Sequence, residues 1–168
     1  MSGIAKNFMI SRTVIKPSYY EISNAREFSE LGLRSTLASV SQLYPNFSSW
    51  LNFKFIRNIQ YGERKAIVAH DGNRILGVSL LKLTPNEKKI CTLFVNENVR
   101  CVHSDMKIGS NLMERSLQLL NYDDVLITVC SEKNEELTPL LNKNSFVKVK
   151  VVQDLYNEGS SEYFYKLK

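Results

Sequence analysis

KIGSNLME, at residues 107–114, decides the fold, because it opens a predicted helix directly after an apolar strand and a polar loop. The first backbone N–H groups of a helix have no partner within the helix, and the helix dipole places partial positive charge there. Diphosphate groups bind well in that setting. Gly109 would let such a group approach the backbone closely, and Lys107 adds a full positive charge. The alternative is an ordinary helix start, in which Gly109 serves only packing.

The elements around this stretch predict a right-handed parallel crossover. Residues 89–95 are mostly apolar, residues 106–120 carry apolar side chains at helical spacing, and residues 123–130 form a second apolar strand. A strand, a helix and a strand in this order normally place the two strands parallel in one sheet. Upstream, residues 65–70 and 74–83 flank an Asp-Gly-Asn turn, which predicts an antiparallel hairpin.

The two ends of the chain supply the remaining elements. One strand is expected at residues 8–15 or 19–22, followed by a helix that Asn24 caps and Pro45 ends. A second helix is expected to begin at residues 48–49. After the crossover come a short helix and a final antiparallel pair of strands, within residues 135–142, 146–152 and 163–167. This order predicts an α/β fold with a mixed central sheet flanked by helices.

Length and composition limit the class of protein. The 168 residues, 43% hydrophobic and 23% charged, suit a single globular domain at residues 1–168. A run of about 18 apolar residues, which a membrane-spanning helix needs, is missing from the sequence. The 3 cysteines and 2 histidines lack the spacing of metal ligands, so we expect free thiols in the cytoplasm and no metal site. The net charge of +5 suits an anionic partner, either a phosphate-bearing cofactor or RNA.

The order of the elements resembles that of the GNAT acyltransferases, and several strings are similar to parts of that family. Residues 62–78 resemble its second and third strands with their hairpin turn, and residues 89–95 resemble its fourth strand. Residues 108–114 resemble the end of its pyrophosphate loop and the helix that follows, and residues 144–149 resemble the entry to its sixth strand. The resemblance covers residues 24–168.

This resemblance implies where acyl-coenzyme A would bind. In the family, the cosubstrate lies in the gap where the fourth and fifth strands separate. Backbone groups of Phe94 and Val95 would hold the pantetheine and polarise the thioester carbonyl. The diphosphate would be held by Lys107, Ile108, Gly109, Ser110 and Asn111.

The chain departs from the family pattern at two places. The family loop has Arg or Gln where this chain has Ser104, and Gly where it has Lys107. Many members place a Tyr, which protonates the leaving thiolate, where this chain has Leu141. The proton would then come from Ser131 or a water, although Ser131 has the alternative role of capping the next helix. Asn134 either bonds to pantetheine or caps that same helix.

The residues expected to contact the acceptor are Tyr44 and Trp50, which flank the break between the first two helices. That break lines the acceptor pocket in GNAT enzymes, and core packing is the alternative role. The leading function is transfer of an acetyl group from acetyl-CoA to an amine of a protein, an aminoacyl-tRNA or a small molecule. The alternative is a GNAT-like module that has lost catalysis and binds a protein or a nucleic acid. The open edge of the final hairpin suits pairing in a homodimer.

Overall fold

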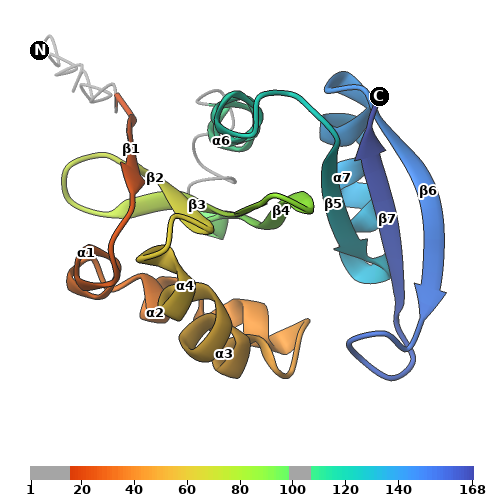
Figure 1. The fold of residues 1–168 in the computed structure, drawn as a ribbon, viewed down its shortest axis with the longest axis horizontal. Helices are drawn as coiled ribbons and strands as arrows, with labels where there is room; N and C mark the ends of the chain where they lie inside the picture. The colour runs from red at the N-terminus through yellow and green to blue at the C-terminus, as the bar shows by residue number, and fades with distance from the viewer. Residues whose placement is uncertain (1–15, 99–106) are drawn as a thin grey trace, which may run out of the picture.

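The structure, a computed structural model, describes residues 16–98 and 107–168 and is built on a seven-stranded sheet with helices on both faces (Figure 1). The strands are β1 (Ser18–Ile22), β2 (Arg64–His70), β3 (Ile75–Thr84), β4 (Glu87–Val95), β5 (Val125–Cys130), β6 (Phe146–Gln153) and β7 (Ser161–Leu167). The helical elements are α1 (Ala25–Glu30), α2 (Leu33–Thr36), η1 (Ala38–Gln42), α3 (Phe47–Trp50), η2 (Leu51–Ile56), α4 (Arg57–Ile59), α6 (Ile108–Leu119) and α7 (Ser131–Lys143).

The sheet is mixed, with the strand order β1-β2-β3-β4-β5-β7-β6. The pair β4–β5 is parallel and the other neighbouring pairs are antiparallel. Helix α6 joins the two parallel strands, which is the crossover that the sequence predicted. The predicted fold class, a mixed sheet flanked by helices, is confirmed.

Two separate hydrophobic cores hold the helices on the sheet. On one face, Leu112 of α6 and Leu141 of α7 are fully buried together with Ile90 of β4. On the other face, Phe28 and Phe55 belong to the core beneath α1 to α4. Figure 1 shows α6 above the sheet and α1 to α4 below it, in line with this division.

Helix α6 packs closely on β3 because a glycine lies at the contact. A Cβ atom on Gly77 would lie 2.8 Å from Cδ1 of Leu112 and 3.0 Å from Cγ2 of Ile108. Beside this contact, the buried hydroxyl groups of Ser79 and Ser116 lie 2.7 Å apart in a hydrogen bond. Apolar packing and a satisfied polar pair therefore fix the helix that carries the KIGSNLME stretch.

The helical face over β2 and β3 differs in part from the prediction. Asn24 caps α1 as expected, and its Oδ1 accepts a 2.8 Å hydrogen bond from the backbone N–H of Glu27. The single helix expected as far as Pro45 is wrong, because Gly32 at φ +68° ends α1 and the chain continues as the short α2 and the 3₁₀ turn η1. The second helix begins at Phe47 and includes a π-helical segment, η2.

Two further expectations concern β1 and α7. The strand expected at residues 19–22 is β1, and residues 8–15 lie outside the described residues. The short helix expected within residues 135–142 is wrong in length, because α7 starts directly after β5 and runs for 13 residues. In the described part of the chain, no helix has the length and apolar character to cross a membrane.

Candidate active site

The parallel strands β4 and β5 separate shortly after they meet. They pair through only three register partners, the last of which joins Ile90 to Ile127. Beyond this pair the end of β4, through Val95, and the end of β5, through Cys130, diverge. The separation opens the sheet itself at its centre, between two strands that are otherwise neighbours.

A β-bulge in β4 accompanies the separation. Leu81 of β3 pairs with Ile90, but Leu80 pairs with Thr92, so Cys91 is the extra residue on β4. A bulge bends its strand, increases the local twist and leaves the extra residue outside the ladder. The bulge therefore lies where β4 turns away from β5.

A cleft of about 650 Å³ occupies the gap, and we call it the inter-strand cleft. It is lined by β4 from Ile90 to Val95, by β5 from Ile127 to Cys130, by residues 96–98, and by side chains of α7 and the α2–η1 segment. Phe94 and Val95, which the resemblance assigned to the pantetheine, both line this cleft.

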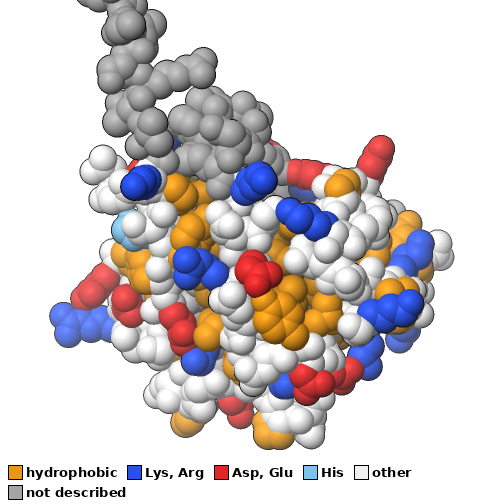
Figure 2. Space-filling model, turned by 90° about the horizontal axis from the view of Figure 1, so that it is seen from above, with side chains coloured by type: hydrophobic (Ala, Val, Ile, Leu, Met, Phe, Trp, Pro, Cys, Tyr) orange, Lys and Arg blue, Asp and Glu red, His pale blue; other side chains and the backbone are white. Residues whose placement is uncertain are grey.

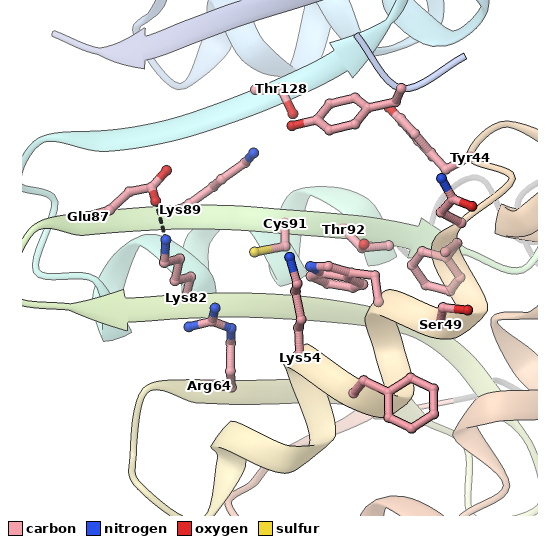
Figure 3. Close-up of a pocket in the computed structure, with 15 residues that line it drawn as sticks. Tyr44, Ser49, Lys54, Arg64, Lys82, Glu87, Lys89, Cys91, Thr92 and Thr128 are labelled. Carbon is pink, nitrogen blue, oxygen red and sulfur yellow. Dashed lines mark hydrogen bonds and ion pairs between the residues drawn. The ribbon is translucent and has the colours of Figure 1, made fainter.

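A second cavity, of about 740 Å³, lies on the side of α3 and η2, and we call it the aromatic–basic cavity (Figure 3). Its aromatic wall includes Trp50 and Tyr44, whose roles in an acceptor pocket the sequence suggested. Trp50 also packs against neighbouring rings, with its centroid 5.6 Å from that of Phe47 and 5.5 Å from that of Phe55. Trp50 therefore has both a packing contact and a place in the wall of the cavity.

The two cavities share four lining residues, which we call the junction: Tyr44, Cys91, Thr92 and Thr128. At the junction, the hydroxyl of Tyr44 donates a hydrogen bond to the carboxylate of Glu162, with 3.1 Å between the oxygen atoms. The same hydroxyl accepts a 3.2 Å hydrogen bond from the backbone N–H of Cys130. A molecule in one cavity would therefore meet a molecule in the other beside a tyrosine and a buried carboxyl group.

The environment of the junction keeps its acidic groups protonated to higher pH than usual. Glu162 is 4% exposed, and its burial raises the pKa of its carboxyl group above the ordinary value. Burial, reinforced by the charge of Glu162, raises the pKa of the Tyr44 hydroxyl strongly, so this hydroxyl is neutral at physiological pH. Burial also raises the pKa of the Cys91 thiol to about 11, so Cys91 is not a thiolate nucleophile at neutral pH.

The start of α6 adjoins the inter-strand cleft at Val95, although Lys107 to Asn111 are not among the described residues that line either cavity. Lys107 takes a left-handed conformation, with φ +51°, immediately before the helix. Ile108 is 4% exposed, whereas among the described residues a Cβ on Gly109 would meet only Cγ2 of Val95, at 3.6 Å. Packing against the described residues therefore does not require a glycine at this position. Ser110 is half-buried, and Asn111 donates a 3.1 Å hydrogen bond to the hydroxyl of Tyr19.

In the structure, Ser131 and Asn134 make hydrogen bonds within the protein and are not among the residues of the junction. Cys130 is the residue that caps α7, so the capping role expected for Ser131 or Asn134 is wrong. The hydroxyl of Ser131 accepts a 3.4 Å hydrogen bond from the backbone N–H of Ser161. Asn134 accepts a hydrogen bond from the hydroxyl of Tyr165. Neither residue is in the described lining of the cavities.

Sequence reasoning missed the most informative residues at the junction. Glu162 is an acidic residue that occupies a buried position of β7, and Thr128 interrupts the apolar strand β5. A carboxyl group at a buried position of a strand is a signal, because carboxyl groups are almost never fully buried without partners. Its pairing with Tyr44, 118 positions away in the sequence, follows only from the sheet topology.

Comparisons with known proteins identify this architecture. No protein-family model and no curated protein matches the sequence. Among solved structures, a protein from Desulfovibrio desulfuricans described as a GNAT-family acetyltransferase has a TM-score of 0.68, with 9% identity over 91% of this chain and 99% of that one. Escherichia coli ElaA has a TM-score of 0.63, with 14% identity over 91% and 100%.

A third solved structure, described as a streptothricin acetyltransferase from Bacillus anthracis in complex with acetyl coenzyme A, has a TM-score of 0.55. Its identity to this chain is 19%, over 70% of each chain. At these levels of identity the likeness concerns the fold. The chain therefore has the GNAT fold, which the order of its elements had predicted.

Proposed function

We propose that this protein is an N-acetyltransferase that moves the acetyl group of acetyl-CoA to the amine of an acceptor. The observation that carries the proposal is the junction, where the inter-strand cleft and the aromatic–basic cavity adjoin at the point at which β4 and β5 separate. Acetyl transfer needs two substrates that reach one point from different directions. The likeness to GNAT-fold acetyltransferases supports the same reaction class.

In this proposal, acetyl-CoA occupies the inter-strand cleft, with its pantetheine along β4 near Phe94 and Val95. The bulge at Cys91 leaves backbone groups outside the ladder, and a free N–H there would polarise the thioester carbonyl. The diphosphate would lie against the start of α6, where Lys107 adds positive charge and the first turn has no acidic residue. The Bacillus anthracis protein of the same fold, crystallised with acetyl coenzyme A, supports this choice of cosubstrate.

The acceptor amine would approach through the aromatic–basic cavity. Its nitrogen attacks the thioester carbon, so that a C–N bond forms and the C–S bond breaks. The attacking amine gives up one proton and the leaving thiolate takes up one proton. The Tyr44–Glu162 pair would hold this proton between the two steps, with the amine passing it to the Tyr44 oxygen as the Tyr44 proton moves to Glu162.

Ser131 and Asn134 have no place in this scheme, since neither is among the described residues that line the two cavities. Leu141, at the position of the family tyrosine, is fully buried in the core. Tyr44 instead supplies a hydroxyl group that lines both cavities and is hydrogen-bonded to a buried carboxylate.

Calorimetric titration with acetyl-CoA and with free coenzyme A tests the first half of the proposal. We expect micromolar binding of acetyl-CoA, and release of free thiol when a suitable amine is added. Lack of acetyl-CoA binding at millimolar concentration would contradict the proposal. Binding without thiol release across a broad panel of amines, peptides and aminoacyl-tRNA would favour the GNAT-like binding module instead.

A further inference from the structure

The aromatic–basic cavity has an excess of positive charge at one end. Its lining includes the basic residues Lys54, Arg64, Lys82 and Lys89 and one acidic residue, Glu87. Figure 3 shows Arg64, Lys82 and Glu87 together at one end of the cavity and Tyr44 at the other. On the face seen in Figure 2, by contrast, the Lys and Arg side chains are spread singly among polar and apolar ones.

Three of the cations stand in one row across the sheet, and we call them the basic row. Arg64 of β2 is the register partner of Lys82 of β3, and Lys82 is the register partner of Lys89 of β4. Register partners in antiparallel strands project from the same face, with Cβ atoms about 5 Å apart. Like charges placed directly opposite each other destabilise a sheet, so the bare row is costly for the protein.

The single carboxylate in the cavity neutralises only part of this charge. Glu87 forms an ion pair with Lys82. Within residues 16–98 and 107–168, neither Arg64 nor Lys89 forms an ion pair with a carboxylate, although the charge of Lys89 opposes the rise that burial causes in the pKa of Glu162. Nη1 of Arg64 donates to the backbone oxygen of Glu63, whereas its Nε is buried without a hydrogen-bond partner. A buried donor without a partner is rare in native proteins, and a ligand group that accepts a hydrogen bond from it would satisfy it.

From the basic row we infer that the acceptor carries an anionic group, a carboxylate or a phosphate, separated from its amine by several bonds. The inference rests on the proposed function and names the class of acceptor. Lys89 precedes Cys91 of the junction by two residues, which is about 7 Å along a strand. An α-amino acid, whose carboxylate lies one carbon from the amine, would not reach both ends. The lining of the cavity also includes the aromatic side chains of Trp50 and Phe53, which suit a flat or apolar spacer.

Four matched amines test the inference by calorimetric binding, without any need for turnover. Tyramine has no anionic group and L-tyrosine has an adjacent carboxylate, whereas 4-(2-aminoethyl)benzoic acid and tyramine O-phosphate have remote ones. We expect the two remote anions to bind at least about tenfold more tightly than tyramine, because charge-assisted hydrogen bonds to Arg64 and Lys89 add to the affinity. Whichever remote anion binds more tightly, the benzoic acid or the phosphate, identifies carboxylate or phosphate as the anionic group of the acceptor.

Charge-removing variants locate the site. Lys89→Met and Arg64→Met should each abolish most of the advantage of the remote anions, while tyramine binding stays the same. Lys89→Arg should retain that advantage, which separates a charge effect from damage to the fold. Lys143→Met, an exposed lysine on α7, is the matched control and should change nothing.

Three results would overturn the inference: equal binding of all four amines, failure of the remote anions to bind at millimolar concentration, or tightest binding of L-tyrosine. A parallel titration with acetyl-CoA keeps the two proposals separate. If the remote anions bind through the basic row but acetyl-CoA does not bind, the anion site stands and the acetyltransferase proposal fails. If acetyl-CoA binds but the amines are not distinguished by charge, the anionic acceptor fails and the acetyltransferase proposal stands.

Discussion

Replacing Gly77 by alanine should destabilise the protein, because this position of β3 has no room for a Cβ atom. The added atom would lie 2.8 Å from Cδ1 of Leu112, 2.8 Å from the carbonyl oxygen of Phe94 and 3.0 Å from Cγ2 of Ile108. The Leu112 side chain has some freedom to move, but the Phe94 oxygen belongs to the backbone of the neighbouring strand. Overpacking of this kind costs about 1–3 kcal/mol of unfolding free energy.

Urea unfolding measures this loss through the fluorescence of Trp50, the only tryptophan of the chain. Gly109→Ala is the matched control, because in the described part of the chain its Cβ would meet only Cγ2 of Val95, at 3.6 Å, and alanine suits a helix better than glycine does. We expect Gly109→Ala to be at least as stable as the wild type. If Gly77→Ala changes the unfolding free energy by less than about 0.5 kcal/mol, the size of an ordinary surface substitution, the account of how α6 packs on β3 is refuted.

Three further substitutions test the site. Burial raises the pKa of Glu162 in the folded state, so its ionisation above pH about 4.3 costs folded stability. Glu162→Gln should therefore have a higher melting temperature than the wild type at pH 7, and this difference in melting temperature should shrink as the pH falls to about 4. The same variant should lose acetyl transfer, and a lower melting temperature at pH 7 would contradict the assignment. Lys107→Gly should relieve the strain of the left-handed backbone conformation and raise the unfolding free energy by about 1 kcal/mol. The same variant should bind acetyl-CoA more weakly in calorimetry, and an unchanged affinity would show that the Lys107 charge does not face the diphosphate. Tyr44→Phe should lower turnover in a thiol-release assay by at least about tenfold with little change in acetyl-CoA affinity, and full activity would remove Tyr44 from the proton path.

The sequence predicted the elements whose signals are local. The hairpin of β2 and β3, the apolar strands β4 and β5, and the amphipathic helix α6 all stand at or near their expected positions. Each combines a clear hydrophobic period with a turn residue, so local preference and the final fold agree. The first helix failed as a single element because Gly32 adopts a left-handed conformation, which apolar periodicity does not reveal.

The candidate site was less accessible from sequence because it depends on distant register. Phe94, Val95, Tyr44 and Trp50 were chosen through the family resemblance, and each lines one of the cavities or both. The carboxyl group of Glu162 went unnoticed, since its partner Tyr44 comes from the opposite end of the chain.

The basic row could not be foreseen for the same reason. Arg64, Lys82 and Lys89 are spread over three strands, and nothing in their sequence spacing aligns them. Their alignment follows from two separate strand registers, one of which includes the bulge at Cys91. A one-residue change in either register would have moved a cation to the opposite face of the sheet.

The measurement that tests the central claim most directly is the backbone amide NMR spectrum of the protein titrated with acetyl-CoA. Our account predicts that the largest shift changes fall on both sides of the separation between β4 and β5, from Cys91 to Val95 and from Thr128 to Cys130, and at the start of α6. Changes confined to other parts of the sheet, or none at millimolar acetyl-CoA, would contradict the claim that the gap between these strands holds the acyl donor.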